Sequence, residues 1–98
     1  MKELMMDAAK WKTVDDLFLA FFRAVEAPSW HGRNFNALRD SIRGGQINNI
    51  EVPYRLVFRN YGQVHPAVRA EADHFINVIH ELAGEGVPVE IRVEETST

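Results

Sequence analysis

The chain has 98 residues, a formal net charge of −3 and no cysteine. This length predicts one domain over residues 1–98, and the lack of cysteine excludes disulfides, a thiol nucleophile and Cys-based zinc sites. A mildly acidic chain suits a basic protein partner better than nucleic acid, whose backbone is itself negative. We expect a cytoplasmic protein with no membrane association, because no signal peptide precedes the domain and no apolar run approaches the ~20 residues of a membrane span.

The N-terminal part of the chain predicts a strand followed by a helix. The strand is expected over residues 3–10, although its apolar pattern is weak and lacks β-branched residues. The helix is expected over residues 13–26, with Thr13 and Asp16 at capping-box spacing and apolar side chains at i, i+3, i+4 and i+7. Pro28 is expected to end it, because a proline disfavours helical geometry at the preceding residue.

A loop over residues 28–33 leads to a second predicted helix over residues 34–43. Asn34 is a favourable N-cap, and Gly44–Gly45 supplies the stop. After a loop over residues 46–52 we expect three further elements, namely a strand over 54–58, a helix over 66–84 opened by Pro66 and a strand over 87–93. Strands separated by helices are joined by crossovers, so the order predicts an α/β fold with a parallel sheet.

Two polar helix faces are candidate binding surfaces. The second helix places Asn36, Arg39, Asp40 and Arg43 on one side, next to a loop that holds Trp30 and His31. Trp and Arg are enriched at binding hot spots. The long helix has its own polar stripe of His74, Asn77, Glu81 and Glu85. Its two carboxylates lie at the negative end of the helix dipole, which is electrostatically unfavourable, and this placement is a weak indication that they have a functional role.

Simpler interpretations of the same residues remain open. A polar helix face is usually just solvated, in which case Asp40 and Arg43 form a surface ion pair and Trp30 packs partly into the core. The histidines lack metal-ligand spacing, and no nucleophile elbow or phosphate loop occurs. His31 with Asp40 is a weak candidate for acid–base chemistry. The sequence therefore predicts no catalytic residue, no metal site and no cofactor.

The segment from Pro28 to Asp40 resembles the signature of the barstar family. That signature is a proline, an aromatic residue and then G-x-N-x-x-A-L-x-D, matched here by Pro28, Trp30, Gly32, Asn34, Ala37, Leu38 and Asp40. Glu51-Val-Pro53 and residues 80–86 also resemble the family's middle and last segments. The resemblance spans nearly the whole chain, with a gap at residues 44–52, where the loop is a few residues longer than in the founding member.

The resemblance implies a three-stranded parallel sheet packed with three or four helices. It also implies inhibition of a small basic ribonuclease, or a related ribonuclease toxin, whose active-site cleft takes an acidic helix and its adjoining loop in place of RNA phosphates. Asp40 is then the main anchor, supported by Glu81 and Glu85, with Trp30 at the aromatic position. The partner-binding residues expected in this way are Trp30, His31, Gly32, Asn34, Asn36, Arg39, Asp40, Arg43, Glu81 and Glu85.

Four positions depart from the family pattern. Asn36 and Arg33 stand where the founding member has acids, and Arg39 and Gly45 replace aromatic residues. The face is therefore less negative than expected, and a like charge set against a basic cleft costs affinity. We expect a changed ribonuclease target. The alternative is a protein-interaction or self-associating module on the same fold, which would form at least a weak dimer where the inhibitor is a monomer.

Overall fold

The computed structural model describes residues 1–28, 32–44 and 48–95. Within these ranges the sheet has three parallel strands in sequential order, namely β1 (Lys2–Asp7), β2 (Tyr54–Arg59) and β3 (Val89–Val93). The helices are α1 (Val14–Ala24), α2 (Phe35–Gly44) and α3 (Pro66–Gly84), with short 3₁₀ turns η1 (Ala8–Lys10) and η2 (Tyr61–Gln63). The predicted α/β class, parallel sheet and number of helices are confirmed.

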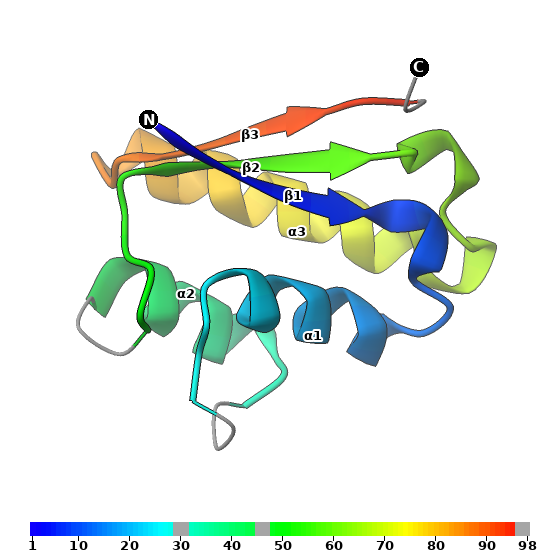
Figure 1. Cartoon of the computed structure of the whole chain (residues 1–98), viewed down its shortest axis with the longest axis horizontal. Coiled ribbons are helices and arrows are strands. Elements are labelled where there is room, and N and C mark those ends of the chain that lie inside the picture. Colours follow the sequence, from blue (N-terminus) through cyan, green and yellow to red (C-terminus); the bar gives the residue numbers. More distant parts are fainter. Residues whose placement is uncertain (29–31, 45–47, 96–98) are drawn as a thin grey trace.

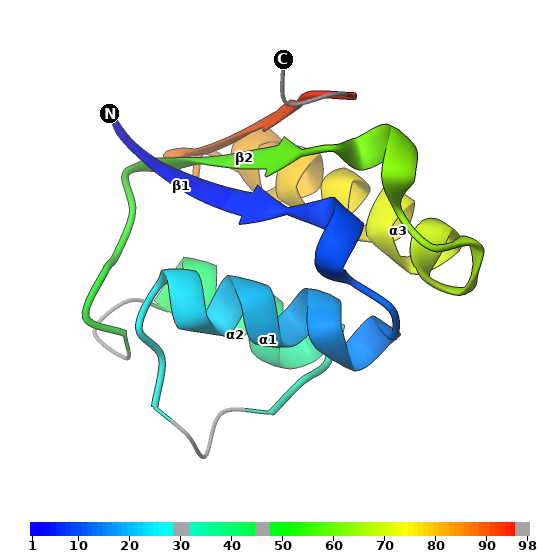
Figure 2. The same cartoon turned by 45° about the vertical axis from the view of Figure 1, so that its right-hand side comes forward.

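The three helices lie against one face of the sheet (Figures 1 and 2). Two crossovers of the same hand, moving in the same direction across the sheet, place their helices on the same side. Phe75 of α3 lies at the centre of the core, and its ring contacts those of Phe21 on α1 and Phe58 on β2, with centroids 5.7 and 5.4 Å away. Burial of this one face is what holds α1 and α3 under the strands.

The first predicted strand extends too far, because β1 ends at Asp7 and not at residue 10. The side chain of Asp7 accepts a hydrogen bond from the Ala9 amide at 3.1 Å, and residues Ala8–Lys10 form the 3₁₀ turn η1. A short polar side chain that bonds the backbone two residues ahead favours a turn over a strand. The last strand likewise begins at Val89, two residues later than predicted.

The capping box that begins α1 is confirmed, but the end of α1 differs from the prediction. Asp16 and Thr13 exchange side-chain-to-backbone hydrogen bonds of 3.1 and 3.2 Å. The helix ends at Ala24, two residues earlier than predicted, so Pro28 is not what ends it. Glu26 has a left-handed φ of 56°, and the Ala27 amide donates to the Phe22 carbonyl at 2.8 Å. This is a Schellman ending, a device for which glycine is the usual residue.

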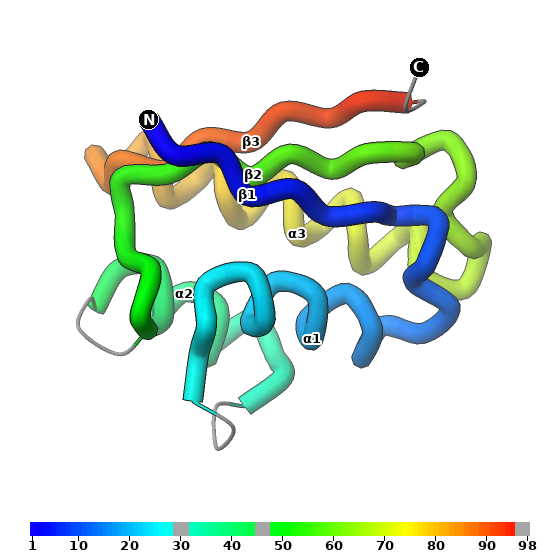
Figure 3. The backbone as a smooth tube through the Cα atoms, in the orientation of Figure 1, coloured from blue at the N-terminus to red at the C-terminus, as the bar shows by residue number. Residues whose placement is uncertain are grey.

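The second helix, α2, runs in the same direction as the C-terminal half of α3 (Figure 3). Phe35 at the start of α2 contacts both neighbouring helices: its ring lies 4.9 Å from that of Phe18 on α1 and 4.3 Å from that of His74 on α3. Leu38 and Ile42 of α2 are buried in the core. These contacts fix the orientation of α2 and leave its polar side facing outward.

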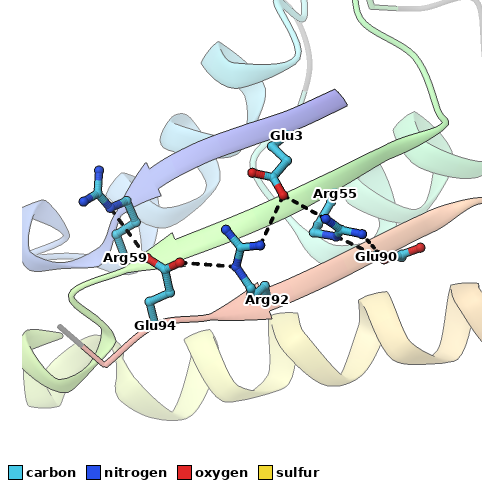
Figure 4. A network of polar contacts seen from close by, with 6 residues as sticks. All are labelled: Glu3, Arg55, Arg59, Glu90, Arg92 and Glu94. Carbon is cyan, nitrogen blue, oxygen red and sulfur yellow. Dashed lines mark hydrogen bonds and ion pairs between the residues drawn. The ribbon is translucent and has the colours of Figure 1, made fainter. Parts of the chain in front are cut away.

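The other face of the sheet carries no helix among the described residues and bears a network of ion pairs instead (Figure 4). Arg55 on the central strand contacts Glu3 on β1 at 2.8 Å and Glu90 on β3 at 2.9 Å. Arg92 contacts Glu3 and Glu94, each at 3.2 Å. Parallel sheets usually have both faces covered. Here the long side chains of the network take the place of a second helical layer.

Candidate partner-binding site

The polar side of α2 is positioned by its N-cap. The Asn34 side chain accepts a hydrogen bond from the Ala37 amide at 2.8 Å, and its carbonyl accepts one from the Leu38 amide at 3.0 Å. Asn34 is therefore the N-cap that the sequence predicts. Because Leu38 and Ile42 are buried, the opposite side of the helix presents Asn36 and Asp40 to solvent.

Asp40 is exposed at the middle of α2 and makes no hydrogen bond or ion pair with any described residue. Its carboxylate is held by a helix that is anchored in the core, so little conformational freedom remains to be lost when a partner binds. Among the described residues, no contact of this carboxylate has to break before it can accept a hydrogen bond from a partner. Asn36, one turn earlier on the same side, is also exposed and without such a contact among the described residues.

The other charged residues of the predicted face are paired across two helices. Arg39 contacts Glu81 at 3.5 Å, and Arg43 contacts Glu85 at 2.7 Å. The simple surface interpretation, in which Asp40 pairs with Arg43 on the same helix, is wrong, because Arg43 reaches α3 instead. The structure thus brings Arg39, Arg43, Glu81 and Glu85 together as two bridges beside Asp40.

Helix geometry explains these two bridges. Arginines four residues apart repel each other on α2, and glutamates four residues apart repel each other at the end of α3. Since the two helices run in the same direction (Figure 3), equal spacing lets each arginine face one glutamate. The arginines also offset the unfavourable placement of Glu81 and Glu85 at the negative end of α3. The matching spacing was the signal in the sequence that could have predicted the bridges.

The loop before α2 is described only in part. Trp30 and His31, and also Gly45 after α2, lie outside the described residues. Gly32 lies in a tight place, because a Cβ there would come 3.0 Å from the side-chain nitrogen of Asn34. Arg33, which replaces an acid of the family pattern, pairs with Asp15 of α1. Its charge is therefore directed toward α1.

The chemistry available at this site is electrostatic contact. Asp40 offers an acceptor that no described residue occupies, and the guanidinium groups of Arg39 and Arg43 offer donors. In the described parts of the chain, no group of three or more histidine or acidic side chains is placed to hold a metal ion. A hollow lined by Met5, Trp11 and Leu19 lies between β1 and α1 and shares no residue with the α2 face.

None of the helices built from described residues has the length and apolar character needed to cross a membrane. A comparison with curated proteins finds no match to the chain. A comparison with protein-family models finds one for barstar, described as a barnase inhibitor, which matches residues 1–94. With the sheet order, the capped α2 helix and the Pro28-to-Asp40 signature in agreement with that match, the chain belongs to the barstar (barnase inhibitor) family of ribonuclease inhibitors, which are not enzymes.

Proposed function

We propose that the chain inhibits a small basic ribonuclease, or a ribonuclease toxin, by placing the polar side of α2 in the active-site cleft. The observation that carries this proposal is Asp40, an exposed carboxylate at the centre of a rigidly capped helix with no described intramolecular partner. Family membership supplies the class of partner, since barstar proteins bind barnase-like ribonucleases.

In the proposed mechanism a carboxylate takes the place of an RNA phosphate. The cleft of such an enzyme is lined with cations that bind the phosphate backbone of the substrate, and Asp40 satisfies one or more of them. Opposite potentials speed the encounter, and a charge pair that loses its water slows escape. Because the helix blocks the cleft physically, substrate is excluded without any chemical step.

The neighbouring residues support this anchor. Glu81 and Glu85 pair with the two arginines that flank Asp40 on α2, and their carboxylates offset the positive charge of those arginines. Trp30 and His31 are proposed as contacts from the adjoining loop, and Gly32 with Asn34 as the residues that shape the turn into α2. The proposed place of action is the cytoplasm of the cell that makes the ribonuclease, where an inhibitor protects that cell.

The direct test is inhibition of RNA cleavage. The chain is mixed with barnase and with a panel of small basic microbial ribonucleases and toxins, and cleavage of a fluorescent RNA is followed. We expect one-to-one inhibition of at least one enzyme. If every enzyme of the panel, including those from the source cell, cleaves at its full rate at micromolar inhibitor, the proposal is wrong.

A substitution tests the anchor itself. Asp40→Ala is expected to weaken the complex by about 2 kcal/mol or more, roughly 30-fold in Kd, as central hot-spot residues do. The matched control is Glu71→Ala, which removes one carboxylate from α3 about 15 Å along the helix from Glu81. We expect the control to change Kd by less than about threefold. A loss below about 0.5 kcal/mol for Asp40→Ala would place it on an ordinary solvated rim.

The self-associating alternative predicts a different result. We propose a monomer, so sedimentation velocity at micromolar concentration should give the mass of one 11.2 kDa chain. A stable dimer whose interface is weakened by Asp40→Ala would show that the same face serves self-association.

A further inference from the structure

The carboxylates on the proposed recognition face differ in how available they are. Asp40 has no partner among the described residues, while Glu81 and Glu85 are bridged by Arg39 and Arg43 at 3.5 and 2.7 Å. Three negative charges on this face are thus offset by two positive ones. Among the described residues of this face, a partner with a uniformly basic cleft meets one carboxylate without an ion pair, two bridged carboxylates and two guanidinium groups of its own sign.

The two arginines can also make contacts of their own. The side chain of Arg43 is 50% exposed and that of Arg39 is 29% exposed, and each reaches its glutamate through a single terminal nitrogen. A guanidinium group has five N–H donors in a planar fork that fits a carboxylate in two places. Neither guanidinium group makes a second ion pair with a described residue, so Arg43, and to a smaller extent Arg39, has donors left for a carboxylate on a partner protein.

The bridges themselves are weak enough to be exchanged. Ion pairs between exposed side chains contribute little, because water competes for both partners. An incoming carboxylate can therefore take over the donors of Arg39 or Arg43. An incoming cation can reach the second oxygen of Glu81 or Glu85, whose side chains are 60% and 52% exposed, but it then lies next to the positive charge of the bridging arginine. The face thus favours a partner of mixed charge over a purely basic one.

We propose that Arg39 and Arg43 are specificity-determining residues that select a ribonuclease with carboxylates at the rim of its cleft. In this assignment a cation of the partner meets Asp40, and the rim carboxylates meet the two arginines. Uniformly basic clefts are rejected by like charge. The inference rests on the proposed function and names the kind of ribonuclease that the site takes.

The test compares two double variants that lower the formal net charge by the same amount. Arg39→Gln/Arg43→Gln removes the bridging cations, and Lys10→Gln/Arg23→Gln removes two cations that have no ion-pair partner among the described residues. Kd and the association rate are measured with barnase and with the ribonuclease of the panel that the chain inhibits best. For barnase, we expect the first variant to associate at least tenfold faster than the control variant.

If Arg39 and Arg43 select the partner, removing both charges should change the affinity for two ribonucleases in opposite directions. The best-inhibited ribonuclease should bind Arg39→Gln/Arg43→Gln at least tenfold more weakly than the parent chain, whereas barnase should bind it more tightly. Equal effects of the two double variants on barnase, or the same sign of effect with both enzymes, would overturn the proposal. The first of these results would show a general charge effect, and the second a structural role of the bridges.

A probe that needs no ribonuclease separates failure of the inference from failure of the proposed function. Octalysine is titrated into each protein, and the backbone amide signals of α2 and of the end of α3 are followed by NMR. We expect Arg39→Gln/Arg43→Gln to bind octalysine at this face at least tenfold more tightly than the parent chain and the control variant do. Equal binding by all three proteins would contradict the rejection of basic partners, whether or not a ribonuclease is inhibited.

Discussion

Gly86 ends α3 in a conformation that few other residues adopt. Its φ is +95°, and the next amide, that of Val87, donates to the Leu82 carbonyl at 3.1 Å. The same hydrogen-bond pattern ends α1, where Glu26 takes the left-handed position. The sequence predicts the first ending, because a glycine stands there. It does not predict the second, because a glutamate carries no signal for a left-handed φ.

Two glycine substitutions test this account of the end of α3. Apart from the adjoining residues and the backbone of α3 itself, a Cβ at Gly86 or at Gly84 would meet no atom within 4 Å, so backbone conformation separates the two positions. Gly86→Ala is expected to lower the free energy of unfolding by about 1 kcal/mol, because alanine resists a positive φ. Gly84→Ala lies in the helix and should leave stability unchanged or raise it by up to about 1 kcal/mol. Urea unfolding measures both, and equal losses would contradict the assigned role of Gly86.

On the uncovered face of the sheet, the sequence predicts that the face is exposed but does not predict which charged side chains pair across the strands. Alternation along residues 87–93 predicts one partly wet face, and the structure agrees. The cross-strand partners depend on register, which places Arg55 opposite both Glu3 and Glu90. Register is a relation between two paired strands, so it cannot be read from any one strand. Val57 beneath the network is fully buried, which indicates that the ion pairs form a cover.

This network makes part of the stability depend on pH. The hydrogen bond from Arg55 holds the pKa of Glu3 below its ordinary value of 4.5, and the positive charge of Arg92 acts in the same direction. A carboxyl whose pKa is lowered in the folded state contributes stability above pH 4.5 and loses it as pH falls through the folded pKa. Glu3→Gln should therefore unfold at a lower temperature than the parent chain at pH 7.

The difference between the two proteins should shrink steadily below pH 4.5, and thermal unfolding followed from pH 7 to pH 2.5 measures it. Glu71→Gln, which removes a carboxyl without a described ion pair, serves as the control and should follow the parent chain. A gap between Glu3→Gln and the parent chain that stays constant over this range would show that Glu3 acts through its shape and not its charge.

The relative orientation of α2 and α3 determines which charged side chains of the recognition face are paired. The polar side of α2 and the acidic end of α3 are both visible in the sequence as helical spacing. The two bridges, Arg39–Glu81 and Arg43–Glu85, form because α2 and α3 run in the same direction, which is a property of the fold. The sequence alone therefore predicts which residues lie on the face, whereas the division between paired and available charges requires the structure.

We propose above all that the Asp40 carboxylate of α2 replaces an RNA phosphate in the cleft of a ribonuclease. A crystal structure of the complex with the best-inhibited enzyme tests it most directly. We predict that α2 lies in the cleft and that the Asp40 carboxylate is within 3.2 Å of an arginine or lysine nitrogen, a charge-assisted hydrogen bond shielded from water. A complex in which α2 faces solvent, or in which Asp40 remains hydrated, would contradict the account.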